Sequence, residues 1–185
     1  MYFIPQPMKV EYKDSGEEQK SFVLSYRSYL VLDPSCGEKL TGQAGLVQKA
    51  LEEKLGFGLA LTRGEGRRGD VILEQCPQME REEYHLTVDE GNVRICGGEA
   101  GVWYGCQTLL QMVEQCGAVL PFAVIEDRPD IPNRGFYHDV TRGRVPKLSF
   151  LKKMADRMAY YKMNQLQLYI EHTFLFRDFS EIWRD

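Results

Sequence analysis

Adjacent carboxylates are the first residues of this sequence that could do chemistry. In such a pair, one carboxyl group can donate a proton while its neighbour stays charged. Three pairs stand out: Glu17-Glu18, Glu52-Glu53 and Glu82-Glu83. Each lies among other charged or solvated residues, and successive side chains of a strand point to opposite faces. We therefore predict that these pairs are surface carboxylates, and we assign no catalytic residue.

The cysteine and histidine residues give no metal-ligand pattern. The cysteines are odd in number, spread out and without a Cys-x-x-Cys pair: Cys36, Cys76, Cys96, Cys106 and Cys116. A disulfide framework is therefore not expected, and we predict buried, reduced thiols. His85 and His138 fall in predicted strands without a partner at ligand spacing, which favours structural roles. The sequence thus predicts no metal and no cofactor.

The first two thirds of the chain predict an α+β domain. Short alternating runs between turn residues are typical of strands, at residues 9–12, 22–24, 29–32, 70–74, 83–88 and 92–96. The last two flank an acidic, glycine-containing turn that is typical of a hairpin. Apolar residues recur at helical spacing over residues 43–55, which Gly56 follows, and over residues 100–115. We expect a sheet with these two helices on one face.

A connector with two prolines, residues 127–133, marks a change of pattern. Prolines restrict their neighbours to extended geometry, so we place a domain boundary here, between residues 1–127 and residues 128–185. The second part predicts a strand (136–140), an amphipathic helix (148–161) and another strand (165–170). This is a β-α-β unit with parallel strands, and one such unit cannot close a sheet or bury both of its faces.

Three stretches occur in a characteristic order and spacing. The first is Ile4-Pro5-Gln6-Pro7, and the second is Glu83-Tyr84-His85-Leu86 followed by the segment from Ala100 to Gln111. The third begins at Ile125-Glu126-Asp127-Arg128-Pro129 and continues through Arg134 to Arg142. Together they resemble glycoside hydrolase family 20, the β-N-acetylhexosaminidases. The resemblance implies an α/β N-terminal domain followed by a (β/α)8 barrel. A complete barrel needs about 250 residues, so residues 128–185 supply only its first β-α-β segment, an incomplete barrel.

The resemblance also implies roles for three residues that follow the two barrel strands. Arg142 follows the first strand and so lies at the carboxyl rim, where barrel active sites are built. The family's arginine here binds hydroxyls of the terminal sugar, which suits the five donors of a guanidinium group. The alternative is that Arg142 only pairs with Asp139 or a helix end. After the second strand the family usually has Thr/Ser-Asp, whereas this sequence has Glu171 and His172, which we expect to contact sugar instead.

Family 20 enzymes hydrolyse their substrate with the help of the substrate's own 2-acetamido oxygen. A glutamic acid protonates the leaving oxygen and a neighbouring aspartate orients the acetamido group. In the family this Asp-Glu pair follows the fourth barrel strand, which residues 1–185 do not reach. We predict an inactive N-terminal fragment of a hydrolase that removes terminal β-linked N-acetylhexosamine from a glycan. The alternative is a non-catalytic carbohydrate-binding or interaction module.

The composition excludes several other classes of partner. A net charge of −4 and a single short basic stretch at residues 63–68 argue against binding of nucleic acid. The sequence has no apolar run long enough to cross a membrane and no signal peptide at its start, so we expect a cytoplasmic location and no membrane partner. The uncovered strands 136–140 and 165–170 favour a homodimer through the barrel segment.

Overall fold

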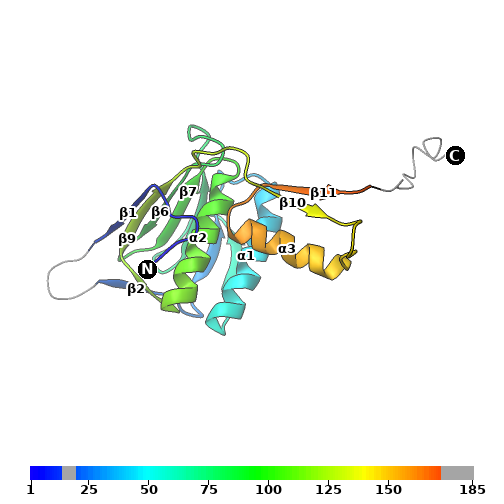
Figure 1. Cartoon of the computed structure of the whole chain (residues 1–185). Helices are drawn as coiled ribbons and strands as arrows, with labels where there is room; N and C mark the ends of the chain where they lie inside the picture. The colour runs from blue at the N-terminus through cyan, green and yellow to red at the C-terminus, as the bar shows by residue number, and fades with distance from the viewer. Residues whose placement is uncertain (14–19, 172–185) are drawn as a thin grey trace. The chain divides into compact units, whose positions relative to one another are not determined.

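The computed structural model describes residues 1–13 and 20–171. The chain divides into two compact units, Met1–Asp130 and Ile131–Asp185 (Figure 1). This division falls within the proline-containing connector, a few residues after the boundary that we placed between residues 127 and 128. In the described ranges no helix is long and apolar enough to cross a membrane.

The first unit is built on a seven-stranded mixed sheet in the order β1-β9-β6-β7-β5-β3-β4. These strands are β1 (Lys9–Tyr12), β3 (Tyr29–Leu32), β4 (Ala60–Arg63), β5 (Val71–Gln75), β6 (Tyr84–Val88), β7 (Val93–Gly97) and β9 (Ala123–Asp127). The first four strands in that order pair antiparallel, and β7, β5, β3 and β4 pair parallel. A separate two-stranded ribbon pairs β2 (Ser21–Val23) with β8 (Val119–Pro121).

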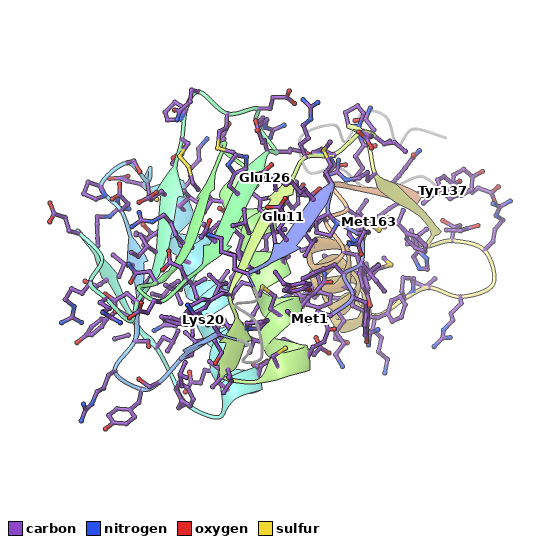
Figure 2. All side chains as sticks on the ribbon, turned by 90° about the vertical axis from the view of Figure 1, so that its left-hand side faces the viewer. Met1, Glu11, Lys20, Glu126, Tyr137 and Met163 are labelled. Atoms are coloured by element: carbon purple, nitrogen blue, oxygen red, sulfur yellow. A yellow bond between two sulfur atoms is a disulfide. The ribbon has the colours of Figure 1, made fainter. Side chains whose placement is uncertain are left out.

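Two helices, α1 (Lys39–Leu55) and α2 (Gly101–Cys116), lie on the same face of this sheet (Figures 1 and 2). α1 packs against α2, β3 and β4, and α2 packs against β5, β6 and β7. The core between the helices and the sheet comes from alternate strand residues, which are fully buried on β6 and β7. Gly56 ends α1 with a φ of 77°, as a left-handed cap requires. The predicted α+β class is confirmed.

Three strands of the first unit were not predicted from the sequence: β4, β8 and β9. β4 and β8 are short, with four and three residues, and β4 lies at an edge of the sheet. β9 has an interior position between β1 and β6. Its residues lead directly into the proline-containing connector, so the sequence analysis treated them as the end of the domain. Its partners lie far away in the sequence, and pairing over such distances leaves no local signal.

α2 approaches the sheet so closely that some of its positions accept only glycine. A Cβ atom built on Gly101 would lie 1.8 Å from the carbonyl oxygen of Glu83, and one on Gly105 would lie 2.5 Å from Cγ2 of Ile95. Residues from Gly101 to Val113 are buried almost without interruption. The glycines therefore allow this helix to become the central element of the core.

The N-terminal segment is held on α2 by two glutamine side chains one turn apart. The amide of Gln111 accepts a hydrogen bond from the backbone N–H of Ile4 and donates one to its carbonyl oxygen, at 2.9 and 2.8 Å. Gln115 makes the same pair of bonds with Tyr2, at 3.0 and 2.7 Å. Between them the side chain of Phe3 is buried. The Ile4-Pro5-Gln6-Pro7 motif therefore follows directly on an N-terminal segment that packs on α2.

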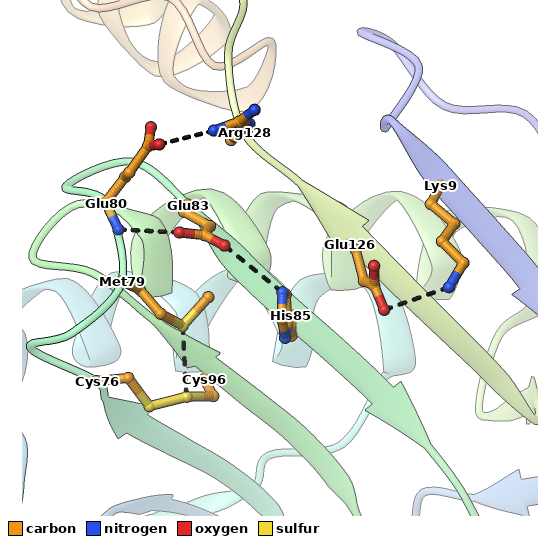
Figure 3. Close-up of polar contacts among 9 residues, drawn as sticks. All are labelled: Lys9, Cys76, Met79, Glu80, Glu83, His85, Cys96, Glu126 and Arg128. Carbon is orange, nitrogen blue, oxygen red and sulfur yellow. Dashed lines mark hydrogen bonds and ion pairs between the residues drawn. A yellow bond between two sulfur atoms is a disulfide. The ribbon is translucent and has the colours of Figure 1, made fainter.

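The expectation of reduced thiols is wrong for two of the five cysteines. Cys76 and Cys96 form a disulfide with Cα atoms 6.1 Å apart, and the sulfur of Met79 lies 3.7 Å from Cys96 Sγ (Figure 3). Cys96 lies on β7, and Cys76 directly follows β5, its parallel neighbour. Strand pairing therefore brings together two residues that are 20 positions apart. The remaining cysteines are free, and burial raises the pKa of the Cys106 thiol to about 12.

The second unit consists of β10 (Gly135–Asp139), α3 (Leu148–Tyr160) and β11 (Gln165–Tyr169). The two strands pair in parallel from Gly135↔Gln165 to Asp139↔Tyr169, which confirms the predicted pairing. One face of the pair is turned toward α3, since the ring of Phe150 lies 5.9 Å from that of His138. Phe136, Leu166 and Leu168 share this face with His138 in the register, and each is more than one third exposed, so α3 covers the face only in part.

Candidate functional site

A polar cluster lies where β10 and β11 end. Asp139 and Tyr169 are directly paired in the register, and Thr141 and Glu171 come two residues after them, past the ends of the two strands. Asp139 and Tyr169 share one face of the two-stranded sheet, because the register pairs them directly. The backbone N–H of Glu171 donates to Oγ1 of Thr141 at 3.1 Å, which ties the two strand ends together.

Arg142 is the central cation of this cluster. Its Nε donates to Oδ2 of Asp139 at 2.6 Å, and its Nη1 lies 3.4 Å from Oε1 of Glu171. The guanidinium carbon lies 4.8 Å from the ring centroid of Tyr169. The pairing with Asp139 that the sequence left as an alternative is therefore present. This ion pair with Asp139 engages one of the five N–H donors of the Arg142 guanidinium group, and the Arg142 side chain remains 60 % exposed.

Asp139 is held in its charged form by the backbone of the turn that follows it. Its Oδ1 accepts hydrogen bonds from the backbone N–H groups of Arg142 and Thr141, at 3.0 and 2.9 Å. These bonds, followed by the contacts with the Arg142 side chain, lower the pKa of Asp139 to about 2. Near neutral pH the carboxylate is ionised, and it fixes the guanidinium group at the strand ends.

Glu171 supplies a second carboxylate beside Arg142. Its Oε1 accepts a hydrogen bond from the hydroxyl of Tyr169 at 2.8 Å, and its side chain is 41 % exposed. A guanidinium donor next to a carboxylate acceptor can bind two neighbouring hydroxyl groups, each of which both donates and accepts. Of the three residues assigned from the sequence, the structure brings Arg142 and Glu171 together, and His172 lies outside the described residues.

A cavity of about 500 Å³ adjoins this cluster in the second unit. Asp139 and Arg142 line it together with three further cations, Arg144, Lys147 and Lys153. Its size is within the range of small-molecule sites. It is electropositive, so it favours ligands that accept hydrogen bonds.

Sequence reasoning missed the roles of Thr141 and Tyr169 in this cluster. The two-residue period of a strand could not show these contacts, because Thr141 and Glu171 lie past the ends of β10 and β11. The structure keeps the other candidates away from it. Glu52 and Glu53 are exposed on α1, Glu83 accepts a bond from the backbone of Glu80, and Glu17-Glu18 lie outside the described residues. Of the described residues, no three His, Cys, Asp or Glu side chains are grouped to hold a metal.

The open face of the seven-stranded sheet carries a smaller cavity of about 260 Å³. Figure 3 shows polar side chains around it, among them Lys9, His85, Glu126 and Arg128. Ion pairs neutralise several of these charges, including Arg128 with Glu80 at 2.7 Å. No tryptophan, tyrosine or phenylalanine lines this cavity, so it lacks a ring on which a sugar could stack. Compared with this cavity, the one beside Arg142 is the better candidate.

Several solved structures that share this fold are glycoside hydrolases. The family 20 exo-β-N-acetylglucosaminidase from Vibrio harveyi, solved in complex with N-acetylglucosamine, aligns over 90% of this chain and 25% of its own, with a TM-score of 0.75 and 22% identity. The family 20 β-N-acetylhexosaminidase from Streptomyces coelicolor aligns over 89% of this chain and 34% of its own, with a TM-score of 0.68 and 28% identity. The first of these likenesses concerns the fold alone.

The sequence gives the family directly. The profile described as glycosyl hydrolase family 20, domain 2, matches residues 1–128, which is more than half of the chain. The chain belongs to glycoside hydrolase family 20. A β-hexosaminidase from Akkermansia muciniphila is 38% identical over 101 residues, which cover 52% of this chain and 20% of that protein. One from Vibrio vulnificus is 29% identical over 113 residues, 60% of this chain and 13% of the relative. The chain thus spans a small part of the length of the relatives that it matches.

Proposed function

We propose that residues 1–185 are the N-terminal part of a β-N-acetylhexosaminidase. In this proposal β10, α3 and β11 begin its catalytic barrel, and Arg142 and Glu171 bind hydroxyl groups of a terminal N-acetylhexosamine. The observation that carries it is the pairing of these two side chains at the carboxyl ends of two parallel strands, 3.4 Å apart. This is the edge of a barrel at which active sites form. Membership of the family and the limited share of its relatives that the chain spans support the proposal.

The test is an assay of the longer polypeptide that carries these residues, with a chromogenic N-acetylglucosaminide. We expect turnover by the longer protein and none above a buffer control by residues 1–185 alone, because the proposed acid and its partner aspartate come from later strands. Arg142→Ala should lower kcat/KM by about 10- to 100-fold, since a hydrogen bond to a charged group contributes about 1.5–3 kcal/mol. Arg68→Ala, which removes an exposed arginine of the first unit, is the matched control and should not change the rate.

The competing proposal is a carbohydrate-binding or interaction module without catalysis. It predicts that the longer polypeptide binds N-acetylglucosamine and releases no product from the chromogenic substrate. That result, with an intact Arg142, would reject the hydrolase assignment. Turnover by residues 1–185 alone would reject the assignment of the acid to later strands.

We also propose that residues 1–185, when produced alone, associate through the second unit. The support is that, among the residues that the structure describes, β10 and β11 form a sheet of two strands, each with an edge that no other described strand pairs, and their apolar residues are exposed. Light scattering should report a dimer, and Leu168→Lys should return the mass to that of a monomer. A monomeric wild-type chain would reject this proposal.

The cytoplasmic location stays a prediction. The disulfide between Cys76 and Cys96 weighs against it, because disulfides persist mainly in oxidising compartments. Fractionation of cells that express the natural gene would decide between a reducing and an oxidising compartment.

A further inference from the structure

We infer that Tyr169 is the positioning residue of the site, holding Arg142 against the face of its ring and Glu171 by its hydroxyl group. This inference rests on the proposed function, because it concerns how the two sugar-binding side chains are kept in place. It names a residue that contacts both of them and whose own position is fixed by the sheet.

The first contact is between the ring of Tyr169 and the cation. The guanidinium carbon of Arg142 lies 4.8 Å from the ring centroid, within the range in which a cation is attracted by the ring's negative face. Asp139 holds the same guanidinium group from one side through Nε. The carboxylate and the ring together restrict a side chain that would otherwise sample many rotamers.

The second contact is between the hydroxyl of Tyr169 and the carboxylate. The hydroxyl donates to Oε1 of Glu171 at 2.8 Å, and the same oxygen lies 3.4 Å from Nη1 of Arg142. This bond raises the pKa of Tyr169, so the hydroxyl remains a donor throughout the neutral range. One side chain therefore holds the donor and the acceptor side by side.

Tyr169 itself is fixed by its place on β11. It is the last residue of the strand, paired with Asp139 in the register. Its ring lies 5.6 Å from the ring of Tyr137 on the neighbouring strand. A tyrosine has few rotatable bonds, so ordering it costs little conformational entropy. A rigid residue that orders two flexible ones reduces the entropy that sugar binding would otherwise have to overcome.

The test measures kcat and KM of the longer polypeptide for the chromogenic N-acetylglucosaminide. Tyr169→Leu, which removes both contacts, should raise KM about tenfold and leave kcat within about twofold, because binding in the ground state and in the transition state weaken together. Tyr169→Phe keeps the ring and removes the hydroxyl, so KM should rise only about threefold. Tyr137→Phe, which keeps its ring contact with Tyr169, is the control and should leave both constants unchanged.

A mutant cycle separates positioning from a general loss of stability. In a background that carries both Arg142→Ala and Glu171→Ala, Tyr169→Leu should have no further effect on KM, since the side chains that it positions are gone. An undiminished effect in that background would overturn the inference, and so would an unchanged KM for Tyr169→Phe in the wild-type background. If Tyr169→Leu fails to fold, the KM of Tyr169→Phe in the wild-type background tests the inference by itself.

The outcomes also distinguish this inference from the proposed function. If Arg142→Ala and Glu171→Ala leave KM unchanged, the sugar-binding assignment itself fails, whatever Tyr169 does. If they raise KM while the Tyr169 variants do not, the site stands and the positioning role is rejected.

Discussion

Asp139 is the residue that links local sequence to the candidate site. It ends β10, and the turn after it presents two backbone N–H groups to one of its oxygens while Arg142 binds the other. The sequence analysis gave this contact as an alternative to sugar binding by Arg142. The geometry makes the two compatible, because the aspartate engages one edge of the guanidinium group and leaves the side chain largely exposed.

The low pKa of Asp139 gives a prediction for pH. Because the folded pKa of about 2 lies below the ordinary value of 3.8, the contribution of Asp139 to stability is complete above pH 3.8 and is lost as the pH falls through about 2. We expect the carboxyl carbon resonance of Asp139 to titrate with a midpoint near pH 2. In Arg142→Ala the midpoint should move up and stay below 3.8, since the backbone bonds are the largest cause of the shift. A wild-type midpoint near 3.8 would contradict this geometry.

At the level of elements, the contact between α2 and the sheet is the least tolerant feature of the first unit. Gly101 faces the backbone oxygen of Glu83, which cannot rotate away as a side chain could. The sequence analysis placed this helix correctly from its apolar pattern, but the pattern gave no reason for the glycines. That reason is the distance between two elements, which depends on the whole packing.

Gly101→Ala is therefore expected to destabilise the protein by about 3 kcal/mol or more, because the new methyl group must displace backbone. Gly45→Ala on α1 is the matched control, since a Cβ there meets nothing within 4 Å. The control should be neutral or stabilise by up to about 1 kcal/mol, because alanine favours the helix. Urea denaturation of both variants measures the difference. Equal stability of the two variants would show that α2 lies farther from β6 than described.

The disulfide makes a second prediction at this scale. Removing it by Cys76→Ala and Cys96→Ala should cost about 3 kcal/mol, because a cross-link across about 20 residues restricts the unfolded chain. Cys116→Ala, at a free and partly exposed thiol, is the control and should change little. Thiol titration of the unfolded protein gives an independent check: three reactive thiols before reduction and five after it. Five thiols before reduction would mean that the bond is absent.

On the scale of the whole molecule, the two units differ in completeness. The first has a sheet covered by two helices and a continuous core, and its strands pair within the unit. The second has two strands and one helix among its described residues, with its apolar strand residues exposed. In the described part of the chain, it is the first unit that has the features of a unit that can fold by itself.

We therefore expect residues 1–130, produced alone, to unfold in one cooperative transition, with the disulfide formed. Calorimetry and circular dichroism would test this, and the 185-residue chain provides the comparison. The transition of the first unit should occur at nearly the same temperature in both proteins. A shorter chain that is unfolded or that melts without cooperativity would mean that the first unit depends on the second.

The sequence by itself determined the elements that depend on near neighbours: both helices of the first unit, the β6–β7 hairpin, the glycine cap of α1 and the β-α-β order of the second unit. It also placed Arg142 and Glu171 at strand ends, because a strand and the residues after it form one local pattern. Tertiary structure alone decided the pairing of β1 with β9, the bond between Cys76 and Cys96, and the contact of Tyr169 with Arg142. These features join residues that are 20 to more than 100 positions apart, and such contacts depend on how the elements pack in space, which no local pattern specifies.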